Sequence, residues 1–189
     1  MLFNLIYPDV PAEVIDGEAD DRLSEMLPIV DESGNVSGQA SRSVCHSKGY
    51  MHPVVHLHII DRMSNVFLQH RSLNKDLMPG RWDTAVGGHI SYGEYVEEAL
   101  YREAGEELGF FDFNPVLLDK YVFDNGSDKE LVCVFATVGH FDIKPDNYEV
   151  QEGRYWSIHD IERAFGKDIL TPQFESEFKK IKEKLLALL

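Results

Sequence analysis

Three glutamates, Glu103, Glu106 and Glu107, stand three and four positions apart in the segment Glu94–Leu108. Apolar residues recur in this segment at helical spacing, and residues three and four apart share one face of a helix. A converged set of carboxylates suits Mg²⁺, which takes carboxylate oxygens and keeps several waters. A solvated acidic helix face is the competing explanation. The residues around the glutamates decide between the two.

The glutamates lie within Gly88–Phe110, which we call the box segment. It reads Gly-His-Ile-Ser-Tyr-Gly-Glu, then seven residues, then Arg-Glu-Ala-Gly-Glu-Glu-Leu-Gly-Phe. This resembles the Nudix box, G-x5-E-x7-R-E-U-x-E-E-x-G-U with U an apolar residue, at every fixed position. Ala104 is a small residue at the first U position. So many fixed identities in a set spacing are a far more specific signal than a lone glycine motif.

The resemblance implies an α/β fold, a Nudix-type α/β/α sandwich with a mixed β-sheet. It also implies an enzyme that depends on Mg²⁺, with Mn²⁺ as an alternative, and cleaves a phosphoanhydride bond. The substrate is then a nucleoside diphosphate derivative or a related diphosphate. By position, Glu103, Glu106 and Glu107 match metal ligands, and the carbonyl of Gly87 matches a frequent extra ligand.

The resemblance carries further roles by position. Arg102 and Glu94 match a pair that supports the loop and the helix. The general base varies within the family. Glu103 is one candidate, and an acid outside the box segment, such as Glu149 or Glu152, is another.

A second resemblance covers the flanks of the box segment. The stretch Phe67-Leu-Gln-His-Arg-Ser-Leu-Asn-Lys-Asp-Leu-Met-Pro-Gly-Arg-Trp82 is similar to the region before the box in isopentenyl-diphosphate isomerases and their hydrolase relatives. The likeness extends over Glu25–Phe165 and implies that Arg71 and Lys75 contact the substrate diphosphate. A chain with a net charge of −15 needs such local donors to hold an anion. Ordinary loop cations are the alternative.

The isomerases also hold a metal ion through three histidines and two acids. The candidates at matching positions are His46, His52, His89, Asp128 and Glu130, although the spacing between the first two is one residue shorter than in the isomerases. Imidazole with carboxylate suits Zn²⁺ or Mn²⁺ as well as Mg²⁺. These histidines are otherwise hydrogen-bonded packing residues, and the sequence leaves both interpretations open.

One departure from the isomerases concerns proton transfer. They use a cysteine acid/base just before the box, and the matching residue here is Gly87, which has no side chain to carry a proton. Cys45 and Cys133 do not align with this position. All box glutamates are present, whereas isomerases often have a degenerate box and sensor modules commonly lose its glutamates. We therefore expect hydrolysis, with an isomerase-type enzyme and a non-catalytic Nudix-fold nucleotide sensor as alternatives.

The elements that must position these residues follow from apolar periodicity and turn residues. Residues 1–26 are expected to be a lead-in segment, and residues 27–189 the Nudix hydrolase domain, including a C-terminal helix at 173–189. The other predicted helices are Glu94–Leu108, with Gly109 as its stop, and Asp160–Phe165. The predicted strands are Leu27–Asp31, Val54–Ile60, Val66–Arg71, Thr84–Ile90, Val116–Phe123, Leu131–Val138 and Gly153–Ser157.

Composition narrows the function class. With 189 residues and a net charge of −15, the chain has room for one sizeable core and repels the phosphate backbone of nucleic acid. The two cysteines form no metal or disulfide pattern, and no signal peptide or membrane span is predicted. A cytoplasmic protein with a small diphosphate-containing substrate is expected. A homodimer stays open, with the apolar segment Leu2–Tyr7 as a candidate interface.

Overall fold

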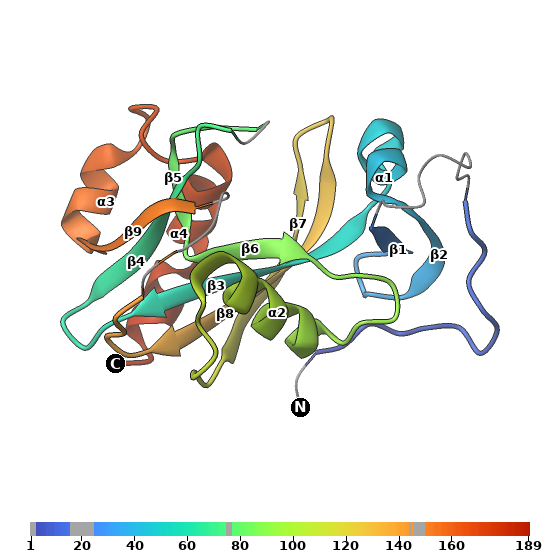
Figure 1. The fold of residues 1–189 in the computed structure, drawn as a ribbon, viewed down its shortest axis with the longest axis horizontal. Coiled ribbons are helices and arrows are strands. Elements are labelled where there is room, and N and C mark those ends of the chain that lie inside the picture. The colour runs from blue at the N-terminus through green and yellow to red at the C-terminus, as the bar shows by residue number, and fades with distance from the viewer. Residues whose placement is uncertain (1–2, 16–24, 75–76, 144, 146–149) are drawn as a thin grey trace. The chain divides into compact units, whose positions relative to one another are not determined.

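The computed structural model describes residues 3–15, 25–74, 77–143, 145 and 150–189. In these residues it has nine strands and four helices (Figure 1). In chain order they are β1 (Met26–Val30), β2 (Val36–Ser41), α1 (Arg42–Lys48), β3 (His52–Ile60), β4 (Asn65–Arg71), β5 (Trp82–Thr84), β6 (Val86–His89), α2 (Val96–Leu108), β7 (Val116–Asp124), β8 (Lys129–Val138), β9 (Val150–Ser157), α3 (Ile158–Ala164) and α4 (Pro172–Leu186).

The chain divides into two compact units that alternate along the sequence. The first unit consists of Met1–Val55, Gly88–Leu100 and Lys120–Cys133. The second unit consists of His56–Gly87, Tyr101–Asp119 and Val134–Leu189. Several strands and α2 contain residues of both units.

The strands form two sheets. β1 and β2 pair in an antiparallel two-stranded sheet, and the larger sheet has the order β5-β4-β3-β8-β7, with β6 paired to β3 and β9 to β4. Every residue of β3 is buried, as expected for the β-branched, apolar run of a central strand. The predicted α/β class is confirmed.

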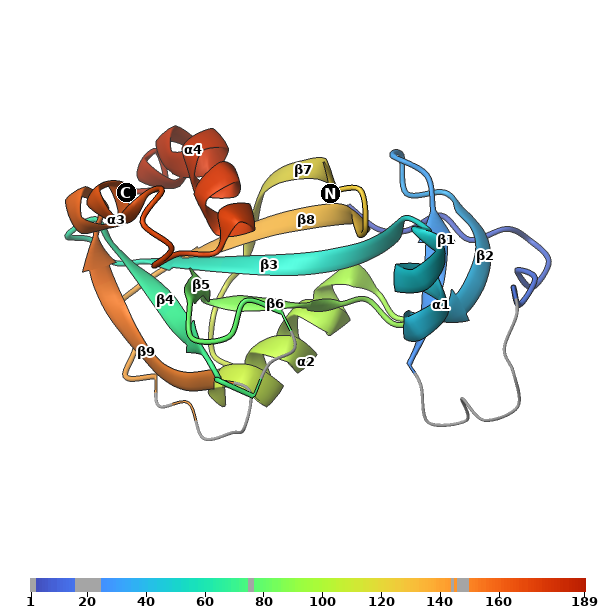
Figure 2. The same ribbon diagram turned by 90° about the horizontal axis from the view of Figure 1, so that it is seen from above.

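The second unit has helices on both faces of its strands. Side chains alternate along a strand, so Leu68 and Gln69 of β4 point to opposite faces. Leu68 belongs to a core cluster with Phe174 and Phe178 of α4. Gln69 donates a hydrogen bond to Glu107 of α2 at 3.1 Å. Figure 2 shows α4 and α2 on opposite sides of these strands.

The first unit has a smaller core of its own. Leu27 of β1, Ala40 of β2 and Cys45 of α1 pack together, and none of them has an exposed side chain. The preceding residues follow β2, with hydrogen bonds from Ile6 N to Gly34 O at 2.9 Å and from Ile15 N to Gln39 O at 2.7 Å. The division into a lead-in at 1–26 and a domain at 27–189 stays a prediction.

Two elements of the structure were not predicted, and two predicted elements differ from it. β2 and α1 were not predicted, because Val36–Lys48 is short, polar and without a clear period. The single strand predicted at Thr84–Ile90 is two strands, because β5 pairs with β4 and β6 pairs with β3. The helix predicted from Glu94 begins at Val96, because Glu94 closes a turn with its N–H bonded to Ser91 O at 3.0 Å.

Candidate active site

Helix α2 carries the three box glutamates and ends where the sequence predicts. Gly109 has a φ of +60°, a left-handed conformation that glycine adopts without strain. Its N–H bonds to Gly105 O at 3.0 Å, and Phe110 N–H bonds to Ala104 O at 3.1 Å. The last turn of α2 is therefore fixed, and with it the direction of the glutamates.

Glu107 is the most constrained of the three glutamates. The residue is only 5% exposed. Its Oε2 accepts hydrogen bonds from Gln69 Nε2 and from Gly87 N–H, both at 3.1 Å. A buried carboxylate must be satisfied in this way, because an unpaired buried charge is very costly. The two bonds hold the Glu107 carboxylate beside the peptide of Gly87, which was predicted as the extra ligand.

Glu103 and Glu106 both form an ion pair with Arg102. Nη1 of Arg102 lies 2.7 Å from Glu103 Oε1 and 3.2 Å from Glu106 Oε2. The side chain of Glu103 is 13% exposed and that of Glu106 is 61% exposed. Arg102 thus lies between two carboxylates of the helix, while Glu107 is bonded to Gln69 and Gly87. Carboxylate oxygens are ligands that a hard cation such as Mg²⁺ accepts.

The other predicted partners of the box are placed as follows. Glu94 accepts a hydrogen bond from Ser91 N–H at 3.0 Å, and its pairing with Arg102 stays a prediction. Glu152 is exposed on β9, opposite His70 of β4. Glu149 lies outside the described residues.

Arg71 points to the same face of β4 as Gln69, two residues away. Its Nη1 lies 3.2 Å from Asp83 Oδ2, and its Nη2 donates to Leu77 O at 2.9 Å. These contacts hold the guanidinium on the face of β4 from which Gln69 bonds to Glu107. Lys75 lies outside the described residues, and diphosphate binding by both cations stays a prediction.

A second cluster lies entirely within the first unit. The ligand atoms of His46, His52 and His89 lie within 4.8 Å of one another, and so do those of His52, Asp128 and Glu130. α1 ends in a left-handed turn at Gly49, which brings the chain back toward β3. Residues far apart in sequence thus converge, although His46 and His52 are more closely spaced than in the isomerases.

The hydrogen bond of His52 determines which of its ring nitrogens carries the proton. Its Nδ1 lies 2.9 Å from Tyr50 O, and a carbonyl only accepts, so Nδ1 carries the proton of the neutral ring. Burial lowers the pKa of His52, more than the Tyr50 hydrogen bond and Asp128 raise it, so the neutral form is favoured. Nε2 then presents a lone pair, 3.8 Å from Asp128 Oδ1.

Two electron-pair donors that face each other are stabilised when a cation lies between them. Neither His52 Nε2 nor Asp128 Oδ1 has a hydrogen-bond partner among the described residues, and both are buried. His46 Nδ1 approaches the same Oδ1 to 3.1 Å, without hydrogen-bond geometry. Buried nitrogen and oxygen atoms whose lone pairs lack a hydrogen-bond partner fit a divalent metal ion. Imidazole together with carboxylate suits Zn²⁺ or Mn²⁺.

A third polar cluster, which we call the His–Glu–His triad, was not predicted. Glu177 of α4 is fully buried, with His56 Nδ1 2.8 Å from its Oε2 and His58 Nε2 2.6 Å from its Oε1. Burial alone would raise the pKa of Glu177, but the two histidines outweigh burial and hold it below its ordinary value. The visible signal was a glutamate on the otherwise apolar face of a predicted helix.

The triad borders the position of the isomerase acid/base. A Cβ added to Gly87 would lie 3.4 Å from the ring of His56, an ordinary contact distance. Cys45 and Cys133 are buried and free. Burial raises the pKa of Cys45 to about 11, helped by Asp128, and burial raises that of Cys133 to about 12. Both thiols stay protonated near neutral pH.

Comparison with family profiles matches residues 51–175 to the NUDIX domain. The chain belongs to the Nudix family. Its box segment is therefore a Nudix box, and α2 is the helix of that box. Among the described helices, none combines the length and apolar composition needed to cross a bilayer.

Two proteins of known family are similar in sequence to this Nudix chain. It is 37% identical over 106 residues to an uncharacterized Nudix hydrolase of Streptomyces coelicolor, covering 56% of this chain and 59% of the relative. It is 28% identical over 166 residues to isopentenyl-diphosphate Delta-isomerase 1 of Photorhabdus laumondii, covering 83% of this chain and 94% of the isomerase. The resemblance to isomerases thus extends beyond the Nudix box, as predicted.

A solved structure from Deinococcus radiodurans has the same fold, with a TM-score of 0.71 at 23% identity, covering 83% of this chain and 99% of that one. The likeness confirms the fold class predicted from the box segment.

Proposed function

We propose that this chain is a divalent-metal-dependent hydrolase that cleaves a phosphoanhydride bond in a nucleoside diphosphate derivative or a related diphosphate. The observation that carries the proposal is the Glu107 carboxylate, which is buried and held by Gln69 and the N–H of Gly87. Glu103 and Glu106 lie on the same helix and share Arg102. Mg²⁺ is the expected cation at Glu103, Glu106 and Glu107, with Mn²⁺ as an alternative.

When bound, a divalent cation polarises phosphoryl oxygens, offsets their charge and acidifies an attacking water. The protein supplies the orientation. Gln69 and Gly87 fix the direction of Glu107, and Arg102 restricts Glu103 and Glu106. Glu103 is one candidate for the general base, and an acid outside the box segment, such as Glu149 or Glu152, is another. We also propose that Arg71, whose guanidinium is paired with Asp83, contacts the substrate diphosphate.

An isomerase-type enzyme is the second candidate function. It is favoured by the cluster of His46, His52, His89, Asp128 and Glu130, which we propose as a second divalent-metal site. It is disfavoured by Gly87, which offers no acid or base at the position of the isomerase cysteine. The Photorhabdus relative is named for isomerase activity.

The free cysteines Cys45 and Cys133 also support a location in a reducing compartment, and we propose the cytoplasm.

A screen of diphosphate substrates with Mg²⁺ and with Mn²⁺ tests these functions together. Phosphate and pyrophosphate release are read separately, and proton exchange at carbon is followed on an isopentenyl diphosphate. We expect metal-dependent release from at least one nucleoside diphosphate derivative and no proton exchange. Exchange without release would assign the chain to the isomerases. Tight nucleotide binding with no product in either metal would make it a sensor.

A further inference from the structure

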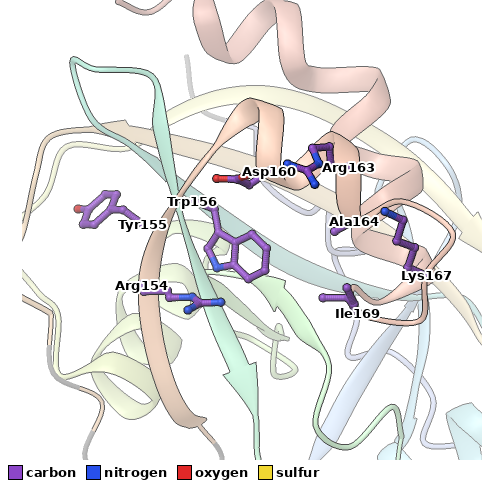
Figure 3. Close-up of a pocket in the computed structure, with 8 residues that line it drawn as sticks. All are labelled: Arg154, Tyr155, Trp156, Asp160, Arg163, Ala164, Lys167 and Ile169. Atoms are coloured by element: carbon purple, nitrogen blue, oxygen red, sulfur yellow. The ribbon is translucent and has the colours of Figure 1, made fainter.

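A pocket of about 460 Å³ lies between β9 and α3, within the second unit. Figure 3 shows the residues that line it: Arg154, Tyr155, Trp156, Asp160, Arg163, Ala164, Lys167 and Ile169. Pockets of roughly 300–1,000 Å³ are typical of small-molecule sites. Neither the Nudix box nor the histidine cluster contributes to this pocket.

The pocket gathers positive charge in an acidic chain. Within the described part of the chain, Arg154, Arg163 and Lys167 form no ion pair with a carboxylate, whereas Arg71, Arg81 and Arg102 each do. Asp160 is the one acid among the lining residues. It accepts a hydrogen bond at 2.8 Å from the hydroxyl of Ser157, the residue that caps the N-terminus of α3. Three cations that lack a carboxylate partner among the described residues, in a chain of net charge −15, favour an anionic ligand.

Arg154 is held in place before any ligand arrives. Its guanidinium carbon lies 4.6 Å from the ring centroid of Trp82 and 4.6 Å from that of Trp156. The two indoles contact each other edge-on at 5.2 Å. A guanidinium stacked in this way loses little freedom when it binds an anion, and its planar donors match phosphate oxygens.

The pocket lies on the opposite face of the sheet from the Nudix box. In the β4–β9 ladder, Leu68 is opposite Arg154 and Gln69 is opposite Gly153. Because side chains alternate, Arg154 is on the face of Leu68, and Gln69 is on the other face, where it bonds Glu107. A ligand in the pocket is therefore separated from the box glutamates by the sheet.

We propose that this pocket is a second ligand site, distinct from the catalytic one, for a phosphate monoester that carries an aromatic ring. Arg154, Arg163 and Lys167 take the phosphate oxygens. Trp156, Ala164 and Ile169 form the apolar wall against which the ring packs. Separation from the box makes the ligand an effector and not the substrate.

The test is calorimetric titration of the full chain with AMP in a chelator, which removes the metal that a box-bound phosphate needs. Adenosine and inorganic phosphate are the two comparison ligands. We expect one AMP site, weaker binding of phosphate and no binding of adenosine. Arg163→Gln and Lys167→Gln each raise the Kd for AMP at least about fivefold, as loss of a charge-assisted contact predicts.

Matched variants locate the binding. Arg62→Gln removes an exposed arginine from the β3–β4 turn, outside the pocket, and leaves the Kd unchanged. Glu107→Gln also leaves it unchanged. The inference is overturned by no AMP binding up to about 1 mM, by wild-type affinity in the Arg163→Gln, Lys167→Gln double variant, or by loss of binding in Glu107→Gln. A glutamate-rich peptide that displaces AMP at lower concentration than phosphate would assign the pocket to a protein partner instead.

Discussion

The two groups of candidate metal ligands differ in their donors and in their surroundings. The Nudix carboxylates are oxygen donors on one helix, and the Glu106 side chain is 61% exposed. The histidine cluster combines imidazoles with carboxylates, and the His52 side chain is fully buried. Oxygen donors beside solvent favour Mg²⁺ with retained waters, while buried imidazole favours Zn²⁺ or Mn²⁺. If both groups bind metal as proposed, they favour different cations, and variants of each group should affect only one of them.

The largest expected effect is on turnover at the carboxylates. Glu107→Gln keeps the size of the side chain and removes its charge, so it should lower kcat at least about 100-fold. Glu97→Gln on the same helix, outside the metal-binding glutamates, is the matched control and should keep wild-type turnover. Steady-state product release with Mg²⁺ measures both. Equal losses of kcat in the two variants would mean that changing the charge of the helix, and not loss of a metal ligand, lowers turnover.

The His–Glu–His triad offers a contrast, because its charge is satisfied within the protein. Glu177→Gln should lower the free energy of unfolding by about 2 kcal/mol, as loss of charged hydrogen bonds predicts. Denaturant unfolding at pH 7 measures the loss. Since the pKa of Glu177 is lowered in the fold, its contribution is present above the ordinary carboxyl pKa of 4.5 and lost as the pH falls below it. A difference between wild type and variant that persists unchanged at acid pH would contradict this assignment.

Metal affinity should distinguish the histidine cluster from the Nudix carboxylates. His52→Asn should weaken Zn²⁺ or Mn²⁺ binding at least about tenfold, since mutation of residues that only support metal ligands already lowers metal affinity that much. His159→Asn, which changes an exposed histidine outside the cluster, should have no effect. Competition with a chromophoric chelator measures both, and Glu107→Gln should leave this affinity unchanged. Loss of Zn²⁺ affinity in Glu107→Gln instead would join the two groups into one site.

The smallest expected effect is at Arg71. Arg71→Gln should raise KM about fivefold with little change in kcat, because the contact is to the substrate diphosphate in ground and transition states alike. Measuring KM and kcat of wild type and variant on the same substrate tests this expectation. A drop in thermal stability with KM unchanged would give Arg71 a structural role through Asp83 and Leu77.

Local features of the site were predictable from the sequence. The spacing of Glu103, Glu106 and Glu107 fixes a shared helix face, and Gly109 marks the end of that helix. These inferences depend on residues within two turns of one another, where helical geometry alone sets the positions. Glu107's partner Gln69 was not predicted, because a single polar residue in an apolar strand does not reveal what it faces.

Long-range features were less predictable. His46, His52 and His89 were named as candidates, but their convergence depends on α1 and its left-handed end at Gly49, and α1 was not predicted. The bonds of Glu177 join residues more than 100 positions apart, which no local pattern encodes. Residue types therefore suggested the chemistry, and tertiary packing decided which residues meet.

The most direct test of the catalytic role is product release by the Glu103→Gln, Glu106→Gln, Glu107→Gln triple variant. The measurement compares it with the wild type on the best diphosphate substrate, with Mg²⁺ and after confirming that the variant is folded. Loss of metal-dependent phosphate or pyrophosphate release is the predicted result, because the three carboxylates are the proposed metal ligands. Undiminished release by the folded variant would contradict it and place the chemistry elsewhere in the chain.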